Sequence, residues 1–106
     1  MTKMNNKFVF ISQPMNGLSN IEILAARNRA KEHFESSEYT VLESYFGNDF
    51  ENSNVPNKGL LYLGESLKLM AKVDLVYFCK GWQNVRGCVI EQQAAKAYGI
   101  ECVYEK

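Results

Sequence analysis

The sequence predicts one α/β domain spanning residues 1–106. We expect three layers: an open, flavodoxin-like or Rossmann-like sheet of four parallel strands in the order 2-1-3-4, with helices on both faces. Short apolar, β-rich segments alternate along the chain with segments of helical spacing, and the apolar residues of the strands are consecutive, as in strands covered on both faces. A length of 106 residues suits one domain and leaves no room for two.

The first strand and the first helix are predicted near the start of the chain. Residues 7–12 (KFVFIS) are apolar and β-rich, and the loop 13–17 contains a proline and a glycine, which are typical of turns. Ser19 and Glu22 have the spacing of a capping box, in which the serine hydroxyl accepts from a free helix N–H and the glutamate binds the serine backbone. We therefore expect a helix from this point to about Ser36.

The middle of the chain predicts a second strand, a long loop, a second helix and a third strand. Residues 39–43 (YTVLE) are β-rich, and 44–58 form a polar loop that is longer than most connections in compact domains. Residues 59–72 have apolar side chains at helical spacing, namely Leu60, Leu63, Leu67 and Met70. Residues 74–79 (DLVYFC) are apolar almost throughout, as expected for a buried strand.

The last quarter of the chain predicts a turn, a third helix and a fourth strand. Residues 80–84 (KGWQN) form the turn, and 85–98 form a helix that Gly99 ends, as glycine commonly does. Residues 101–104 (ECVY) form the last strand. Because helices separate the strands, the strands should be parallel and joined by right-handed crossovers.

Composition and charge exclude several classes of function. Twelve basic residues balance twelve acidic ones, so the chain lacks the positive charge with which proteins bind duplex nucleic acid. No apolar stretch approaches the roughly 20 residues of a membrane helix, and the polar residues 1–7 do not resemble a signal peptide. Three cysteines without a CxxC pair indicate reduced thiols in a cytoplasmic protein. The single histidine, His33, lies in a charged helical stretch, so we expect no metal site and no cofactor.

Two loops are expected to form a ligand site. In the strand order 2-1-3-4, strands one and three flank the topological switch point, and open α/β sheets bind ligands outside the carboxyl ends of the strands at such a point. The loops 13–17 and 80–87 should meet there. We therefore expect functional side chains in these loops and at the start of the third helix.

Glu91 has a side chain that does not match its predicted position. At 100° per residue, this carboxylate falls in the middle of the apolar stripe of the third helix, facing the sheet. The same stripe contains Gly87, Cys88, Ala94, Ala95 and Tyr98. Burying a carboxylate is costly unless the helix N-terminus or free N–H groups compensate. Glu91 is therefore either a nucleophile or an acceptor for a ligand hydroxyl, or a partly exposed glutamate that only suits the helix dipole.

Other residues near the two loops are candidate ligand contacts. Trp82 either stacks on a base or closes the pocket, or it packs in the core. Arg86, with the N–H groups of Gly87 and Cys88, forms an anion site at a helix start or remains a solvated arginine. Gly17 and Gly87 either let the backbone approach a ligand or satisfy turn geometry. A thiol nucleophile at Cys88 would need a basic partner, and the single histidine lies in the first helix.

Four segments resemble the small nucleoside 2-deoxyribosyltransferase-like family, whose members are common in Firmicutes and their phages. The segments are 12–17 (SQPMNG), 62–67 (YLGESL), 74–82 (DLVYFCKGW) and 86–91 (RGCVIE), and the resemblance covers nearly the whole chain. In the characterised enzymes of this superfamily, a glutamate on the helix after the third strand attacks the anomeric carbon, and Glu91 matches its position. The base leaves, and a second base or water then resolves the glycosyl ester.

The resemblance also implies roles for other residues. The loop after the first strand would line the sugar and base pocket, through Ser12, Gln13, Pro14, Met15 and Gly17. Ser66 stands where the enzymes have an aspartate that protonates the leaving base. Val85 stands where they have an aspartate or serine that holds a sugar hydroxyl or phosphate. Related pockets lie at dimer interfaces, so the resemblance implies a homo-oligomer.

Three functions are therefore considered as hypotheses. The first is cleavage of the N-glycosidic bond of a nucleoside or nucleotide, by transfer or hydrolysis, through a covalent glycosyl intermediate on Glu91. The second is a non-catalytic module that binds a nucleotide in the same pocket, because both usual catalytic helpers are replaced. The third is a scaffold without a ligand, whose pocket would be filled by Met15, Tyr45 and Trp82.

Overall fold

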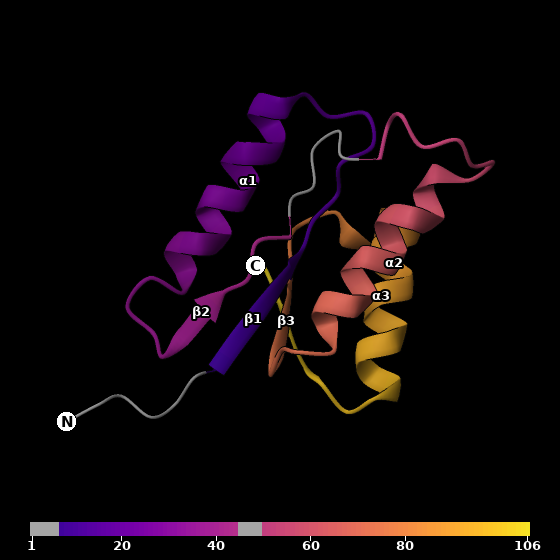
Figure 1. Cartoon of the computed structure of the whole chain (residues 1–106). Coiled ribbons are helices and arrows are strands. Elements are labelled where there is room, and N and C mark those ends of the chain that lie inside the picture. The colour runs from indigo at the N-terminus through magenta and orange to yellow at the C-terminus, as the bar shows by residue number, and fades with distance from the viewer. Residues whose placement is uncertain (1–6, 45–49) are drawn as a thin grey trace.

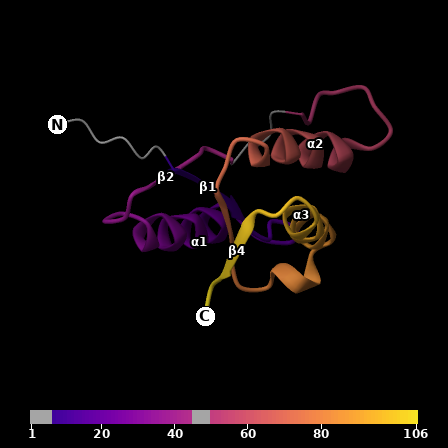
Figure 2. The ribbon, with the colours of Figure 1, turned by 90° about the horizontal axis from the view of Figure 1, so that it is seen from below.

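A four-stranded parallel sheet in the order β2-β1-β3-β4 forms the middle layer, as predicted (Figure 1). The computed structural model describes residues 7–44 and 50–106. The strands are β1 (Lys7–Ser12), β2 (Tyr39–Val41), β3 (Leu75–Phe78) and β4 (Glu101–Tyr104). The helices are α1 (Asn20–His33), α2 (Lys58–Met70) and α3 (Arg86–Ala97), with a short 3-10 helix at Trp82–Asn84. From below, α1 lies on one side of the sheet and α2 and α3 lie on the other (Figure 2).

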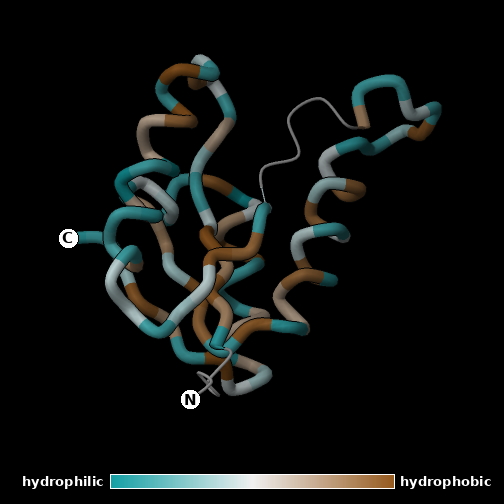
Figure 3. Tube along the Cα trace, turned by 60° about the vertical axis from the view of Figure 1, so that its left-hand side comes forward, coloured by the Kyte–Doolittle hydropathy of each residue, from teal (hydrophilic) through white to brown (hydrophobic). Residues whose placement is uncertain are grey.

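The alternation of side chains along β1 and β3 divides the core into two halves. The half that faces α1 contains Val9, Ile11, Ala30, Phe34, Leu75, Tyr77 and Cys79. The half that faces α2 and α3 contains Phe10, Met70, Val76, Phe78 and Ala95. Figure 3 shows apolar residues along the central strands and an alternation of polar and apolar residues along α2. Because both faces of the central strands are covered, their apolar runs are nearly continuous.

The first helix begins with the predicted capping box. The Ser19 hydroxyl accepts from the Glu22 N–H at 3.2 Å, and the Glu22 carboxylate accepts from the Ser19 N–H at 2.8 Å. The helix ends at His33, earlier than predicted. The Ser37 hydroxyl donates to the Phe34 carbonyl at 2.8 Å, which closes a turn at this point.

Several element ends differ from their predicted positions. The strand β2 ends at Val41, and the carbonyl of the next residue, Leu42, accepts from the buried side chain of Arg27 at 3.1 Å. The helix α2 begins at Lys58, where the side chain of Asn57 accepts from a first-turn N–H. The ends of β3 and α3 differ from the predictions by one residue, which is ordinary for such boundaries.

Three apolar side chains that were expected to face the core are exposed. Leu60 and Leu67 on α2 are 61% and 38% exposed. The buried side of α2 is instead marked by Ser66 and Met70, and no other described helix or strand lies over the outer side of this helix. Tyr98 is 84% exposed, because it is the C-cap residue, where α3 has already ended. Among residues 7–44 and 50–106, no helix has the length and apolarity needed to cross a membrane.

Candidate functional site

The carboxylate of Glu91 lies inside the protein. Its helix α3 buries Cys88, Glu91 and Ala95, which follow one another at helical spacing. The side chain of Glu91 is 7% exposed. The predicted position in the apolar stripe is therefore confirmed, and the alternative of a partly exposed glutamate is wrong.

Three elements hold this carboxylate. The Ser12 hydroxyl, at the end of β1, donates to Glu91 Oε1 at 2.6 Å. A hydrogen bond of this length to a carboxylate is typical of the charge-assisted type. Ser66 lies on the buried side of α2, and its hydroxyl is close enough to lower the pKa of the Glu91 carboxyl group. The sheet and both helices of this layer therefore meet at one acidic group.

Burial changes the acidity of Glu91. Loss of solvation is the largest influence and raises the pKa of this carboxyl group, whereas the hydroxyls of Ser12 and Ser66 lower the pKa in part. The group therefore retains its proton to a higher pH than an ordinary glutamate. A carboxyl group with a raised pKa at the carboxyl edge of an α/β sheet is a candidate functional group.

The thiol of Cys88 is not prepared to act as a nucleophile. Burial raises its pKa to about 11, and the Glu91 carboxylate adds to this effect, whereas the Ser12 hydroxyl lowers the pKa. Burial also raises the pKa of Cys79 to about 12. The ring of His33 contacts Tyr77 on the α1 side of the sheet, whereas Cys88 lies on α3, which covers the other side. Burial therefore disfavours the thiolate form of Cys88 that a nucleophile requires.

The loop after β1 and the turn after β3 lie together, as predicted. A side-chain carbon placed on Gly81 would lie 3.5 Å from the ring of Pro14. The side chain of Gln13 is buried and turned away, because its amide donates to the Ile23 carbonyl of α1 at 2.9 Å. Met15 is half-buried. The backbone of Gly17 has a φ of 78°, so the turn itself accounts for this glycine.

Arg27 is a residue of the site that the sequence analysis missed. Its side chain is 2% exposed, and one terminal nitrogen, Nη1, donates to Gln13 at 3.4 Å and to Ser44 at 3.2 Å. The other, Nη2, donates to the Leu42 carbonyl at 3.1 Å and pairs with Glu43 at 2.7 Å. Arg27 therefore joins the carboxyl ends of β1 and β2. A signal was present, since Arg27 shares a helical face with Ile23, Ala30 and Phe34.

Trp82 is not brought to the carboxylate of Glu91. Its ring packs 5.2 Å from that of Phe78 on β3 and 5.3 Å from that of Tyr104 on β4, measured between centroids. Glu91 is bound at the end of β1, and β3 lies between β1 and β4. Two strand spacings amount to about 10 Å. Trp82 and Glu91 therefore lie over opposite sides of β3.

The start of α3 is open. Arg86, its first residue, is exposed, and the side chain of Val85 makes no capping bond to the free N–H groups of the first turn. A side-chain carbon placed on Gly87 would meet nothing within 4 Å, so packing does not require a glycine there. Cys88, two residues further on, is buried. An anion site at this helix start stays a prediction.

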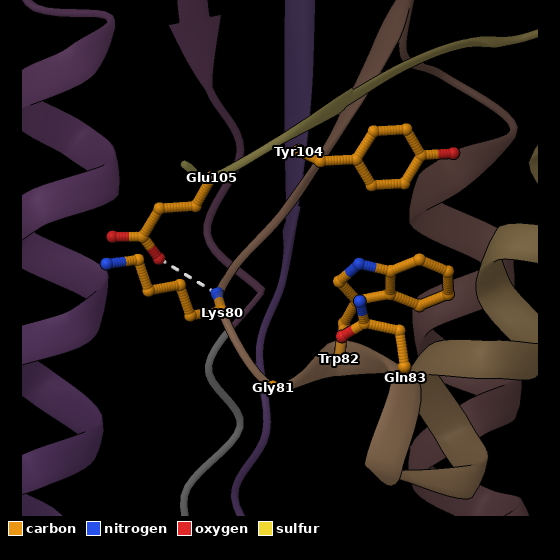
Figure 4. A pocket seen from close by; sticks show the side chains of 6 residues that line it. All are labelled: Lys80, Gly81, Trp82, Gln83, Tyr104 and Glu105. Atoms are coloured by element: carbon orange, nitrogen blue, oxygen red, sulfur yellow. Dashed lines mark hydrogen bonds between the residues drawn. The ribbon is translucent and has the colours of Figure 1, made fainter.

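Two cavities lie beside β4 in the described part of the chain. One, of about 270 Å³, lies over Trp82 and Tyr104 (Figure 4). The other, of about 730 Å³, lies between the end of α1 and β4 and includes His33 and Tyr77. Glu91 lines neither of these two cavities. Tyr45, which was expected to fill a pocket, lies outside the described residues. In the described part of the chain, no group of three or more His, Cys, Asp or Glu side chains is arranged to hold a metal ion.

Comparison with known proteins matches the chain to one family model. This model, described as "Domain of unknown function (DUF4406)", matches residues 7–104. The match begins with the first residue of β1 and ends with the last residue of β4, so it includes every strand and helix described above. Searches of curated proteins and of solved structures found no match.

Proposed function

Because this chain belongs to the DUF4406 family, a domain of unknown function, we propose its activity from the site itself: it cleaves the N-glycosidic bond of a nucleoside or nucleotide through Glu91. The observation that carries the proposal is the buried carboxylate at the end of β1, bound by the Ser12 hydroxyl at 2.6 Å. The strand order puts this group beside the switch point between β1 and β3, where open α/β sheets bind ligands.

The proposed reaction has two steps. An oxygen of the Glu91 carboxylate attacks the anomeric carbon, and the bond between that carbon and the base nitrogen breaks. The bonding electrons leave with the base, which takes up a proton from solvent, and the sugar remains as an ester of Glu91. Water or a second base then adds to the anomeric carbon and loses a proton to solvent, and the ester bond breaks to restore the carboxylate.

The surroundings of Glu91 support a role as nucleophile. Burial disfavours the ionised carboxylate, and forming an ester removes its charge. The hydroxyls of Ser12 and Ser66 oppose this effect and favour ionisation, which the attack requires. The Ser12 hydrogen bond also orients one oxygen of the carboxylate.

The open start of α3 favours a substrate that carries a phosphate. The first-turn N–H groups of this helix have no side-chain cap from Val85, and Arg86 is exposed beside them. Such a helix start attracts anions through its free N–H groups and its partial positive charge. We therefore expect nucleoside monophosphates to be better substrates than nucleosides.

A cytoplasmic homo-oligomer is the proposed setting of the reaction. The three cysteines are free, which suits a reducing compartment. Exposed apolar side chains on α1 and α2, namely Ile21, Leu24, Leu60 and Leu67, offer surface that a second copy would cover. Light scattering after size exclusion tests the oligomer, and a monomer at all concentrations would contradict it.

Base release is the direct test of the activity. The protein is incubated with deoxynucleosides, ribonucleosides, their monophosphates and NAD, and free base is followed by chromatography. Glu91→Gln should lower the rate on the order of a thousandfold or more, since it removes the nucleophile. Glu101→Gln, which removes an exposed carboxylate from β4, is the matched control and should retain the rate. A rate that Glu91→Gln leaves unchanged would refute the assignment.

A non-catalytic nucleotide-binding module is the second candidate. It is favoured by the position of the carboxylate, which the Ser12 hydroxyl already binds and which is 7% exposed. Neither Ser66 nor Val85 supplies the acid or polar group that the related enzymes have at these positions. In this case a nucleotide should raise the melting temperature and be recovered intact, whereas recovery of free base would exclude the candidate.

A further inference from the structure

Two aromatic side chains form a surface at the carboxyl edge of β3 and β4. The ring centroids of Trp82 and Tyr104 are 5.3 Å apart, and their planes differ by 30°. Figure 4 shows the two rings beside one another, not as the two walls of a slot. The ring of Phe78 contacts both, at 5.2 Å from Trp82 and 5.3 Å from Tyr104. The three rings thus make a continuous aromatic platform, supported from within the core.

The platform is open to a cavity of about 270 Å³. Tyr104 remains 36% exposed, and Trp82 is half-buried. The cavity is slightly smaller than the usual range for ligand pockets, so it suits one heterocyclic ring and not a whole nucleotide. Gln83 lines the rim, and its amide both donates and accepts hydrogen bonds.

Hydrogen bonds fix the walls of this cavity. The Gln92 amide on α3 donates to the Tyr104 hydroxyl at 3.2 Å. The Lys80 N–H donates to the Glu105 carboxylate at 2.9 Å, as Figure 4 shows, and Arg29 pairs with the other oxygen of that carboxylate at 3.2 Å. A surface that is already ordered loses little entropy when a ligand binds.

The platform is separate from the carboxylate described above. At this edge of the sheet Ser12, Phe78 and Tyr104 are register partners on successive strands. Glu91 is bound to the first of them, and Trp82 stacks on the other two. Because Phe78 is fully buried between the two positions, a ligand on the platform does not occupy the position beside Glu91.

We propose that Trp82 and Tyr104 form a second binding site, which takes an uncharged planar aromatic ring such as a free purine or pyrimidine base. Every nucleobase has a flat face that stacks on aromatic side chains, so such stacking binds bases of any kind. The side chains of Lys80 and Glu105 bring opposite charges to the lining, so the site favours a neutral ring over an anion. The amide of Gln83 hydrogen-bonds polar atoms at the edge of the bound ring. This second site does not depend on the activity proposed for Glu91.

Fluorescence tests this site directly, because Trp82 is the only tryptophan of the chain. The full chain is titrated with adenine and with thymine, and ribose 5-phosphate serves as the probe without a ring. Both bases should quench the emission in a saturable way, and the sugar phosphate should not. Absence of saturable quenching by either base would overturn the proposal, as would equal quenching by the sugar phosphate.

Variants locate the bound ring. Tyr104→Leu removes half of the platform but keeps the fluorescent reporter, and it should weaken binding about tenfold. Tyr98→Leu is the matched control, since it removes a tyrosine that is 84% exposed, and it should bind as the wild type does. Equal affinities of these two variants would overturn the proposal. Tyr104→Phe keeps the ring and should retain the affinity, which covers the case in which the leucine variant does not fold.

Glu91→Gln separates this site from the proposed function. We expect this variant to bind adenine with unchanged affinity, whether or not base release is observed with the wild type. A loss of quenching in Glu91→Gln would show that both groups belong to one pocket and would overturn the second site. Quenching without any base release would leave the second site standing while the proposed activity fails.

Discussion

Replacing Glu91 with glutamine should stabilise the fold at neutral pH, although it removes the proposed nucleophile. Burial raises the pKa of this carboxyl group, and the hydroxyls of Ser12 and Ser66 offset only part of the effect. The ionised form is therefore less favourable in the folded protein than in the unfolded chain. Glutamine is uncharged and retains an oxygen that accepts from Ser12, while its NH₂ group donates to a hydroxyl.

The magnitude follows from the linkage between pKa and stability. Each unit by which the folded pKa exceeds the unfolded pKa lowers the free energy of unfolding by about 1.4 kcal/mol once the pH is above both values. Glu91→Gln should recover this amount for each unit of the shift once the pH lies above the folded pKa. For a domain of this size, each kcal/mol recovered raises the melting temperature by about 4–8 °C.

The pH dependence has a definite sign. Because the folded pKa of Glu91 is raised, the native state holds more protons than the unfolded state between the two values. The stability of the wild type therefore falls as the pH rises from the ordinary value of 4.5 through the folded pKa, and this loss is complete above it. Glu91→Gln does not titrate, so the two proteins should differ least in acid and diverge as the pH rises.

Urea denaturation at a series of pH values measures this divergence. Glu101→Gln is the control, because it removes an exposed carboxylate and should show no comparable divergence from the wild type. If Glu91→Gln is less stable than the wild type above neutral pH, or differs from it equally at every pH, then burial does not destabilise this carboxylate and the reasoning is wrong.

Three further perturbations test other parts of the structure. Arg27→Met should lower the unfolding free energy by about 2–4 kcal/mol, because it leaves buried acceptors at the ends of β1 and β2 without a donor; a loss below about 1 kcal/mol in urea would contradict this. Ser66→Ala removes a hydrogen bond that lowers the pKa of the site carboxyl, so the pH-dependent loss of stability should extend to higher pH, and an unchanged profile would argue against the bond. Cys102 should be alkylated before Cys79 and Cys88, whose pKa values burial raises to about 12 and about 11; mass spectrometry of partly labelled protein gives the order, and early labelling of either buried thiol would contradict it.

The architecture was predictable because its signals are local. Consecutive apolar residues mark β1 and β3 as covered on both faces, and the Ser19 capping box marks the start of α1. The parallel order then follows from the alternation of strands and helices, with the crossover rule. The burial of Glu91 was predictable for the same reason, since a helix repeats its faces every few residues.

The grouping of side chains around the site was less predictable, because it depends on contacts between distant elements. Arg27 was missed, since a charged residue is ordinarily assigned to solvent and its partners come from the ends of two strands. The leucines of α2 were assigned to the core from spacing alone, but spacing does not tell which side of a helix has a neighbour. Trp82 is separated from Glu91 because its ring packs against Tyr104 on β4. That contact depends on the register in which β4 pairs with β3.

Ser66 shows why a residue's position and its chemistry must be considered separately. The nucleoside 2-deoxyribosyltransferases that this sequence resembles have a leaving-group acid at this position, and the serine cannot serve as one. Its hydroxyl instead lowers the pKa of Glu91. An aspartate there would act in the opposite direction, because two adjacent buried carboxylates do not both ionise readily. Among the described residues no cation pairs with Glu91, so nothing would offset a second negative charge. In this chain the serine therefore favours the ionised form of Glu91, and under the proposed mechanism the departing base must take its proton from water.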